Sequence, residues 1–254
     1  VPLAILGIPE DAEIAVIEMG ANHQKEIAFL SEISQPTHGL ITNIGKAHLE
    51  GFGGVEGVRK GKGELYDYLA AHNGVVFYNQ EEQFLPEMAQ RISRRLSYAT
   101  KEVWLRPDNR VPLQIQQLEP YIIFDLIFSD SNRRPTFEVP LLGPYNLANV
   151  VTAMAVASYF EVDWEVIQEA LQTFQPESNR SEQVIWRDNT ILLDAYNANP
   201  NSMKAAIDSF ARIKGPQKKI MVLGEMYELG EYAAEEHWEV AAMCEKYPDI
   251  DLIL

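Results

Sequence analysis

The feature that most limits the fold of this sequence is a set of short apolar runs, each followed by polar or glycine residues and then by a helix-like segment. Such runs are typical of parallel strands, which are buried on both faces and therefore do not alternate apolar with polar residues. In sheets of this kind, ligands bind beyond the carboxyl ends of the strands. The runs and the residues that follow them are 12–17 before Glu18, 38–42 before Asn43, 74–78 before Asn79, 190–193 before Asp194, and 219–223 before Gly224.

The segments between these runs follow other patterns. Residues 24–33, 146–160 and 164–174 repeat apolar side chains every three or four positions, which predicts amphipathic helices. Residues 101–142 mix apolar runs with Pro and Asn, which indicates antiparallel hairpins, and residues 250–254 read as a last strand. The predicted fold class is therefore α/β, with a mostly parallel sheet and a smaller antiparallel portion.

A domain boundary is predicted at the polar, proline-containing segment 175–179, which separates a helix from a new block that begins with a strand. We therefore place one domain at residues 1–177 and a second at residues 178–254. The chain begins with Val1 and ends on a predicted strand, so we expect it to be part of a longer protein.

Charge and cysteine content exclude several classes of protein. The formal net charge of −16 argues against a general binder of nucleic acids or anionic membranes. It leaves room for a nucleotide substrate, because helix N-termini, Mg²⁺ and a few local bases can hold phosphates. The single cysteine, Cys244, excludes an intrachain disulfide and favours a reducing compartment. No apolar run is long enough to span a bilayer.

The first candidate site residues follow the first two runs. Glu18 is placed to bind a metal or act as a general base, or it is simply a solvated carboxylate near a helix start. His48 is placed to ligate a metal through a neutral imidazole, or it is an ordinary surface histidine. Because the ends of adjacent parallel strands meet, we expect Glu18, Asn43 and His48 to lie together.

Two further groups of polar residues have equally open interpretations. Asn146 and Asn149 stand at the start of a helix, where they are suited to a purine edge or to helix capping. Asp194 is suited to ribose hydroxyls, although the residues after it are also typical of a turn. No Gly-x-Gly-x-x-Gly follows any run, and no Gly-x-x-x-x-Gly-Lys-Ser/Thr occurs.

The stretch VRKGKGELYDYL, residues 58–69, packs three bases and two glycines into its first six residues. Its spacing does not match a phosphate-binding loop. From the residues alone, it is expected to be a solvated basic turn at the start of a helix.

Taken in order, several motifs resemble those of the Mur ligase family of ATP-dependent amide-bond ligases. The resemblance extends from about Ala15 to the C-terminus, and a chance match of several motifs in fixed order is improbable. The matching stretches are AVIEMGANHQKEI (15–27), ITNIGKAHLEGFGG (41–54), KGELYDYL (62–69), GPYNLANVVTAMAVA (143–157), LLDAYNANPNSM (192–203) and VLGEMYELGE (222–231).

The resemblance implies a protein of three domains: a UDP-binding domain, a central ATPase domain and a C-terminal Rossmann-like domain. This chain would hold most of the central domain and the first part of the third. The phosphate-binding loop of the family lies upstream of Glu18 and is not in the sequence, so we do not expect this stretch alone to catalyse the reaction.

The resemblance also implies an activity. Residues 196–200 and 223–230 favour the member that joins D-alanyl-D-alanine to UDP-N-acetylmuramoyl-tripeptide in peptidoglycan precursor synthesis. That reaction uses ATP and Mg²⁺ and passes through an acyl phosphate. We accordingly expect these two substrates as partners and a monomer in the bacterial cytoplasm, with neither nucleic-acid binding nor membrane insertion.

The central-domain site residues are implied by the resemblance. Glu18 and His48 match Mg²⁺ ligands of the family, and Asn43 matches an active-site asparagine. Lys62 aligns with a lysine that reacts with CO₂ to form a carbamate, which is a further oxygen ligand for Mg²⁺. That reaction needs a neutral amine and hence a lowered pKa, and the glycines on either side of Lys62 would allow close packing.

The nucleotide-binding residues are implied in the same way. Asn146 and Asn149 match amides at the adenine of ATP. Arg180 and Asp194 match the arginine and aspartate that hold the phosphate and ribose side of ATP.

The last motif residues, Asn197 and Asn199, are expected near the amine substrate. Two departures from the family pattern occur beside these motifs. Tyr145 replaces a common histidine, which puts the details of adenine packing in doubt, and Ala195 replaces a common serine, which removes a hydroxyl near the nucleotide.

Two alternative functions remain. The first is that the chain belongs to another member of the superfamily, such as the ligase that adds the third residue or a folylpolyglutamate synthetase. The second is that it is a non-catalytic relative that acts as a binding module. Residues 196–200 argue against the first alternative. The retained charged residues at the proposed sites argue against the second.

Overall fold

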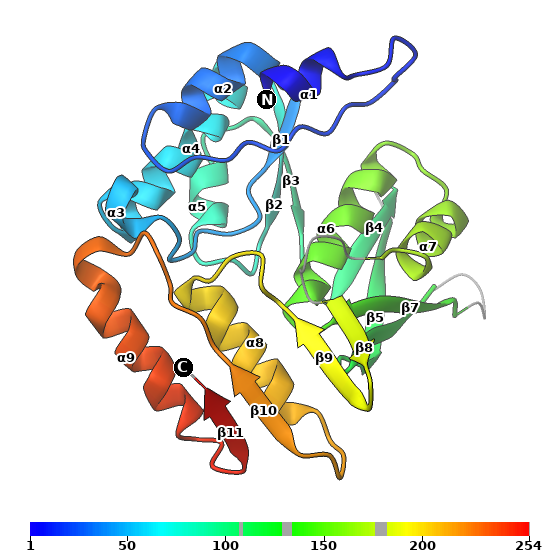
Figure 1. Ribbon diagram of the computed structural model, residues 1–254. Coiled ribbons are helices and arrows are strands. Elements are labelled where there is room, and N and C mark those ends of the chain that lie inside the picture. Colours follow the sequence, from blue (N-terminus) through cyan, green and yellow to red (C-terminus); the bar gives the residue numbers. More distant parts are fainter. Residues whose placement is uncertain (107–108, 129–133, 176–181, 254) are drawn as a thin grey trace. The chain divides into compact units, whose positions relative to one another are not determined.

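The computed structural model describes residues 1–106, 109–128, 134–175 and 182–253 (Figure 1). Its contacts divide the chain into two compact units, which are described separately. Unit 1 comprises Val1–Ser97 together with Glu228–Glu231, and unit 2 comprises the remaining residues. The predicted boundary at 175–179 lies almost entirely outside the described residues.

Unit 1 is organised around a three-stranded sheet with the order β1-β2-β3. Strands β1 and β2 are parallel, as the apolar runs predict. In the structure, His38 lies opposite Val75. Helices α2 and α4 pack on each other, and α4 and α5 contact β2. The elements are α1 (Pro2–Leu6), α2 (Glu26–Ser34), β1 (His38–Leu40), α3 (Leu49–Phe52), α4 (Val55–Ala71), β2 (Val75–Asn79), α5 (Leu85–Ala89) and β3 (Arg94–Tyr98).

The sequence predicts that the glycine-rich basic stretch forms a turn at the start of a helix. This prediction is wrong, because the stretch lies inside the 17-residue helix α4. Tertiary packing overrides the low helix propensity of glycine here. A Cβ at Gly57 would lie 1.8 Å from the Phe52 carbonyl oxygen, and one at Gly61 would lie 2.3 Å from the Phe52 ring. The expected close packing at Gly61 is confirmed, and it places Lys62 in a helix pressed against α3.

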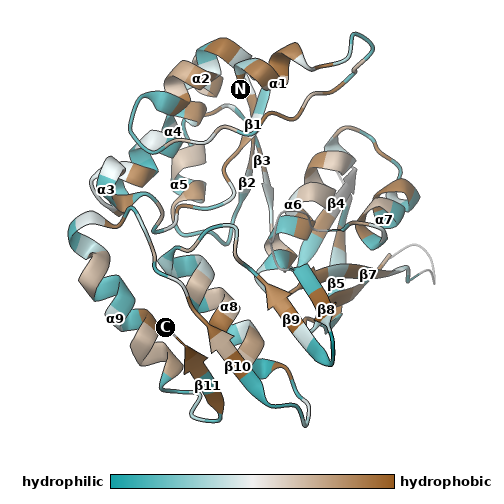
Figure 2. Ribbon diagram, in the orientation of Figure 1, coloured by the Kyte–Doolittle hydropathy of each residue, from teal (hydrophilic) through white to brown (hydrophobic). Residues whose placement is uncertain are grey.

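The prediction of a strand at residues 12–17 is wrong, because these residues form no strand. Ile14 is 53% exposed and Val16 is 90% exposed. A strand persists only when neighbouring strands pair with its backbone, and no strand in the described parts of the chain pairs with this run. Apolar side chains of α1 are exposed as well, and Figure 2 shows the hydrophobic colour of that helix.

Unit 2 contains a four-stranded antiparallel sheet with the order β4-β5-β6-β7, which confirms the hairpins predicted between residues 101 and 142. Phe124 and Phe137 stack across β6 and β7 with ring centroids 5.0 Å apart, and both are fully buried. Two of the predicted helices, α6 and α7, contact this sheet. The elements are β4 (Glu102–Arg106), β5 (Asn109–Gln117), β6 (Tyr121–Leu126), β7 (Thr136–Leu142), α6 (Asn146–Tyr159) and α7 (Trp164–Gln172).

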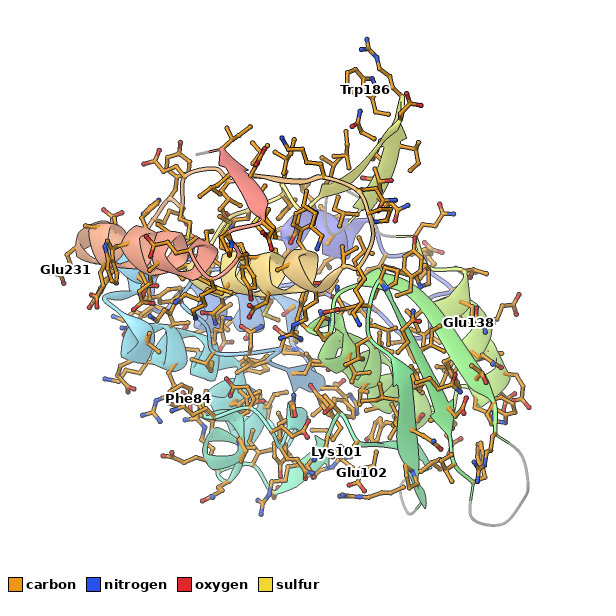
Figure 3. The ribbon with its side chains drawn as sticks, turned by 90° about the horizontal axis from the view of Figure 1, so that it is seen from below. Phe84, Lys101, Glu102, Glu138, Trp186 and Glu231 are labelled. Carbon is orange, nitrogen blue, oxygen red and sulfur yellow. The ribbon has the colours of Figure 1, made fainter. Side chains whose placement is uncertain are left out.

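The rest of unit 2 begins with an antiparallel hairpin, which corrects the parallel strand expected at 190–193. Only Arg187 and Asp188 separate its two strands, and such a short connection permits antiparallel pairing alone. In Figure 3, Trp186 stands at the end of this hairpin. Strands β10 and β11 then pair in parallel, which confirms the strands predicted at 219–223 and 250–254. The elements are β8 (Glu182–Trp186), β9 (Asn189–Leu193), α8 (Pro200–Arg212), β10 (Lys219–Val222), α9 (Ala233–Cys244) and β11 (Ile250–Ile253). The short helix η1 (Gly230–Tyr232) begins in the segment Glu228–Glu231 of unit 1.

In the part of the chain that the structure describes, every helix is too short or too polar to cross a membrane.

Candidate functional site

Lys62 is a partly buried ionisable group of unit 1. It lies in α4, and its Nζ donates a hydrogen bond to the backbone oxygen of Asn43 at 2.9 Å. Burial lowers the pKa of the Lys62 amine, while the negative charge of Glu82 acts in the opposite direction. A lowered pKa increases the neutral fraction of the amine, and the neutral amine is the nucleophilic form.

The loop that follows β1 is held in place by Glu82. One carboxylate oxygen of Glu82 accepts a hydrogen bond from the Ile44 backbone N–H at 3.1 Å. The other accepts from the N–H groups of Phe84 and Leu85 at 2.8 and 3.0 Å, at the start of α5. Glu82 therefore holds in place the loop whose Asn43 backbone oxygen accepts the hydrogen bond from Lys62. The role of Glu82 was not predicted from the sequence, because its partner Ile44 lies 38 positions away.

His48 immediately precedes α3 and has a left-handed backbone, with φ of 55°. Its Nδ1 makes a short contact with the carboxylate of Glu228. The backbone of the two segments also pairs, because the Glu50 N–H donates to the Glu228 carbonyl oxygen at 3.1 Å. Glu228 lies in the motif 222–231, but no role for it was predicted from the sequence.

Glu18 lies in the irregular segment before α2 and is exposed. The residues that follow it approach His48. Glu26 accepts hydrogen bonds from the backbone of Asn22 at 2.7 Å and His23 at 3.0 Å, which orders this turn. A pocket of about 490 Å³ is lined by Gly20, Ala21, Asn22, Glu26, Phe29, Leu30 and His48.

The structure thus joins the predicted residues of unit 1 in two ways. Asn43 and Lys62 are in direct contact, and His48 shares a pocket with the turn that follows Glu18. Glu18 itself stands at no strand end, so the geometric argument that placed it beside Asn43 is wrong.

The suitability of these residues for Mg²⁺ depends on their donor chemistry. Among the described residues, no three His, Cys, Asp or Glu side chains are gathered so that they could hold a metal ion. Mg²⁺ does not require such a cage, since it usually keeps several waters and binds one or two carboxylates together with substrate phosphates. The exposed Glu18 carboxylate fits this mode, whereas the half-buried His48 imidazole offers a nitrogen donor, which Mg²⁺ binds less readily than oxygen. Lys62 fits only as a carbamate, because an ammonium group repels a cation.

The two asparagines of α6 bond to each other. Asn146 is buried and donates to the Leu142 carbonyl oxygen at 2.8 Å, and its own side-chain oxygen accepts from Asn149 at 3.0 Å. The capping interpretation of Asn146 is wrong, because Tyr145 occupies the N-cap and Asn146 is the first helical residue. Asn149 is exposed, so Asn146 orients an amide that is accessible to a ligand.

The remaining predicted residues of unit 2 lie between β9 and α8. Asp194 directly follows β9 and is exposed, and Asn197 accepts a hydrogen bond from its neighbour Ala198 at 2.8 Å. Asn199 caps α8: its side chain accepts from the N–H groups of Asn201 and Ser202. Arg180 lies outside the described residues.

The capping box of α8 leads to a stability prediction. Replacing Asn199 by alanine leaves the first N–H groups of the helix without their acceptor, so we expect a loss of about 1 kcal/mol in the free energy of unfolding. Asn199→Asp should retain most of the stability. Asn201→Ala is the matched control, since no capping bond involves its side chain. Equal urea midpoints for Asn199→Ala and Asn201→Ala would contradict the capping role.

Family models match most of the chain. The model of the Mur ligase middle domain matches residues 1–157, and that of the Mur ligase glutamate ligase domain matches residues 179–254. The chain is 35% identical to the UDP-N-acetylmuramoyl-tripeptide--D-alanyl-D-alanine ligase of Bacillus subtilis over 95% of its length. It is 30% identical to the ligase of the same name from Escherichia coli over its whole length. It spans about half of each relative, 51% and 55% respectively.

Solved structures show the same similarity. A crystal structure of MurF from Acinetobacter baumannii superposes with a TM-score of 0.81 at 27% identity, covering 99% of this chain and 58% of that one. The structure of MurF ligase from Thermotoga maritima in complex with ADP gives a TM-score of 0.80 at 25% identity, covering 99% of this chain and 56% of that one. The predicted fold class is confirmed.

Proposed function

The chain belongs to the Mur ligase family, and from this premise we propose that the protein that carries it is an ATP-dependent ligase that joins D-alanyl-D-alanine to UDP-N-acetylmuramoyl-tripeptide. The names of the relatives in Bacillus subtilis and Escherichia coli support this substrate pair. The ADP complex of the Thermotoga maritima relative supports a nucleotide as co-substrate. The product is a peptidoglycan precursor, and we expect a monomer in the bacterial cytoplasm.

The observation that carries the proposal is the environment of Lys62. A partly buried amine with a lowered pKa, held against the Asn43 carbonyl, is suited to react with CO₂. A bond forms between Nζ and the carbon of CO₂, and Nζ releases a proton to solvent. The resulting carbamate is an anion with two oxygen donors. An ordinary solvated lysine would remain protonated and unreactive.

In the proposed reaction, a carboxylate oxygen of the tripeptide attacks the γ-phosphorus of ATP, and ADP leaves. The amine of D-alanyl-D-alanine then attacks the acyl phosphate, and the tetrahedral intermediate collapses with loss of phosphate and of the amine's proton. There is little covalent work for the protein, so positioning and charge neutralisation account for most of the catalysis.

The residues of unit 1 are assigned to the phosphoryl-transfer step. Glu18, His48 and the Lys62 carbamate would hold Mg²⁺, which when bound offsets the charge on the transferring phosphoryl group. The Asn43 backbone oxygen orients the Lys62 side chain, and Asn43 itself is exposed. Glu82 keeps this loop in place through its bond to Ile44.

The residues of unit 2 are assigned to the nucleotide and to the amine substrate. Asn149, oriented by Asn146, would bind the adenine edge, and Asp194 would accept hydrogen bonds from ribose hydroxyls. We assign Arg180 to the phosphates from the resemblance alone. Asn197 and Asn199 are proposed near the amine substrate, and because the Asn199 side chain caps α8, its effect there would come through the helix start.

We also propose a division of the chain into a central ATP-binding domain, residues 1–177, and the start of a C-terminal Rossmann-like domain, residues 178–254. The two family models support this division, because one ends at residue 157 and the other begins at residue 179. The parallel pair β10 and β11, with α8 and α9, supports the α/β character of the second part.

The proposal predicts phosphate release that depends on D-alanyl-D-alanine. In the protein that carries this chain, we expect Glu18→Ala and His48→Ala each to reduce that release by at least about 10²-fold, since each removes a group that stabilises charge in the transition state. The measurement is phosphate release with UDP-N-acetylmuramoyl-tripeptide and ATP. Glu13→Ala and His72→Ala are the controls, because both residues are exposed and neither is assigned to the site.

Near-normal turnover in Glu18→Ala or His48→Ala would remove that residue from the metal site. Release that depends on a different amine, such as a free amino acid, would favour another member of the family. No release with any amine, by a protein that still binds ATP, would favour a binding module.

A further inference from the structure

The contact between Glu228 and His48 joins residues that are 180 positions apart in the sequence. His48 lies in the part of the chain matched by the middle-domain family model, and Glu228 in the part matched by the C-terminal model. Both belong to unit 1, because Glu228–Glu231 groups with the N-terminal segment. The contact therefore brings a carboxylate from the second family region onto a proposed ligand residue of the first.

An exposed ion pair by itself is weak and frequently has no role. The His48 and Glu228 side chains are 31% and 50% exposed, so the side-chain contact alone would not distinguish this pair from an ordinary surface pair. The backbone around the pair provides the distinction.

The segment that carries Glu228 is anchored on both sides of the contact. The Glu228 carbonyl oxygen accepts from the Glu50 N–H at 3.1 Å, and the next residue, Leu229, is 1% exposed. Gly230 follows, and a Cβ there would lie 3.1 Å from Cβ of Glu50. The carboxylate of Glu228 is thus presented by a fixed backbone, and holding it toward His48 requires little additional ordering.

Both partners also have a left-handed backbone, with φ of 55° at His48 and 59° at Glu228. Residues other than glycine seldom adopt this conformation, which is strained and persists only where the surroundings enforce it. Two such residues in contact indicate a geometry that is maintained despite local strain.

A carboxylate can only accept a hydrogen bond, so the proton in this contact lies on His48 Nδ1. In a neutral imidazole, a proton on Nδ1 leaves Nε2 with its lone pair. Carboxylates that accept from the distal nitrogen of a metal-binding histidine fix the tautomer and orientation of its ring.

The geometry points to Glu228 as a positioning residue that holds His48 in the Nδ1–H tautomer and leaves Nε2 available as a ligand for a divalent cation. This inference deepens the proposed function and rests on it for the identity of the bound metal. It assigns a role to a carboxylate in the block 222–231, beyond the metal ligands themselves.

The decisive measurement is the tautomer of His48 in the metal-free protein that carries this chain. With ¹⁵N-labelled histidine at alkaline pH, NMR distinguishes a protonated from an unprotonated ring nitrogen, and His48→Gln identifies the His48 signals by their loss. We expect the Nδ1–H form to predominate in the wild type. Glu228→Gly should shift the population toward Nε2–H, because glycine retains the left-handed backbone at no cost while the carboxylate is lost. Glu228→Gln keeps an acceptor oxygen and should restore the wild-type tautomer.

Mn²⁺ affinity, measured by electron paramagnetic resonance, provides the second readout. We expect it to fall by about 10- to 100-fold in Glu228→Gly and to change much less in Glu228→Gln. Glu231→Ala is the matched control: this glutamate belongs to the same segment and is exposed, and Figure 3 shows it labelled near the start of α9. Exchange of the Glu50 amide with deuterium tests whether the backbone contact survives in each variant.

An unchanged His48 tautomer in Glu228→Gly, with a slowly exchanging Glu50 amide, would overturn the inference. If this variant also releases the segment, Glu228→Gln becomes the deciding variant, and a lost Nδ1–H form despite a protected Glu50 amide would overturn the inference too. Failure of the proposed function has a different signature. A wild-type protein without amine-dependent phosphate release would refute the ligase, whereas the tautomer measurement would still decide the role of Glu228.

Discussion

Replacing Lys62 by alanine is expected to lower D-alanyl-D-alanine-dependent phosphate release by about 10³-fold, which corresponds to about 4 kcal/mol of transition-state stabilisation. The substitution removes the amine whose carbamate would supply an oxygen ligand for Mg²⁺. Lys60→Ala is the matched control, because Lys60 lies in the same helix but its side chain is 65% exposed. Its ion pair with Glu56 is long, with 4.0 Å between Nζ and Oε1. We expect Lys60→Ala to retain nearly full activity.

The carbamate can be detected without measuring activity. In the presence of ¹³C-labelled bicarbonate, we expect a carbamate carbon signal in the wild type and in Lys60→Ala, and no such signal in Lys62→Ala. Burial lowers the pKa of Lys62, so a larger fraction of its amine is neutral below the ordinary lysine pKa. The signal should therefore grow as pH rises and should develop at a lower pH than for a solvated lysine. Full activity in Lys62→Ala would contradict the assignment.

The largest expected effect on stability comes from Gly57→Ala. The new Cβ would lie 1.8 Å from the Phe52 carbonyl oxygen and 2.7 Å from the Phe52 carbonyl carbon, so α3 and α4 would have to separate. Only Gly53 and Gly54 separate α3 from α4 in the sequence, so this short connection limits how far the two helices can move apart. We expect the free energy of unfolding to fall by about 3 kcal/mol, because the clash outweighs the roughly 1 kcal/mol by which alanine favours a helix over glycine.

Gly63→Ala is the matched control in the same helix. A Cβ there would meet only the ends of two flexible side chains, Arg91 and Met88, at 3.1 and 3.2 Å. These can shift by a few tenths of an ångström, so we expect Gly63→Ala to be close to neutral. Thermal unfolding of both variants measures the difference. A midpoint for Gly57→Ala equal to that for Gly63→Ala would contradict the close approach of α3 to α4.

Several elements could be predicted from the sequence because their burial is recorded in local spacing. The uninterrupted apolar run at 74–78 predicts β2, in which every residue except Tyr78 is buried, and the three- and four-residue spacing predicts α2, α6 and α7. The same spacing is uninformative where glycine is frequent. The turn predicted within residues 58–69 was therefore wrong. Glycine is needed at Gly57 and Gly61 of α4 because the carbonyl and the ring of Phe52, which lies in α3, approach them closely.

The candidate site divides in the same way. The residue types that suit it, a carboxylate, an imidazole, a lysine and several amides, can be recognised in the sequence, and the motif order points to the Mur ligase family. The supporting carboxylates were not recognised. Glu82 binds a backbone N–H 38 positions away, and Glu228 contacts a histidine 180 positions away, so no local pattern marks either partner.

By itself, the sequence determined the α/β class, the strands β1, β2, β10 and β11, the antiparallel hairpins of residues 101–142, and the family. These follow from periodicity and from motifs, both of which are properties of contiguous residues. Only the tertiary structure decided that residues 12–17 form no strand, that β8 and β9 form a hairpin, that Lys62 is buried enough to lower its pKa, and that Glu228 meets His48. The physical reason is that periodicity records which face of a segment is buried, whereas pairing, desolvation and charge contacts depend on which distant segment covers that face.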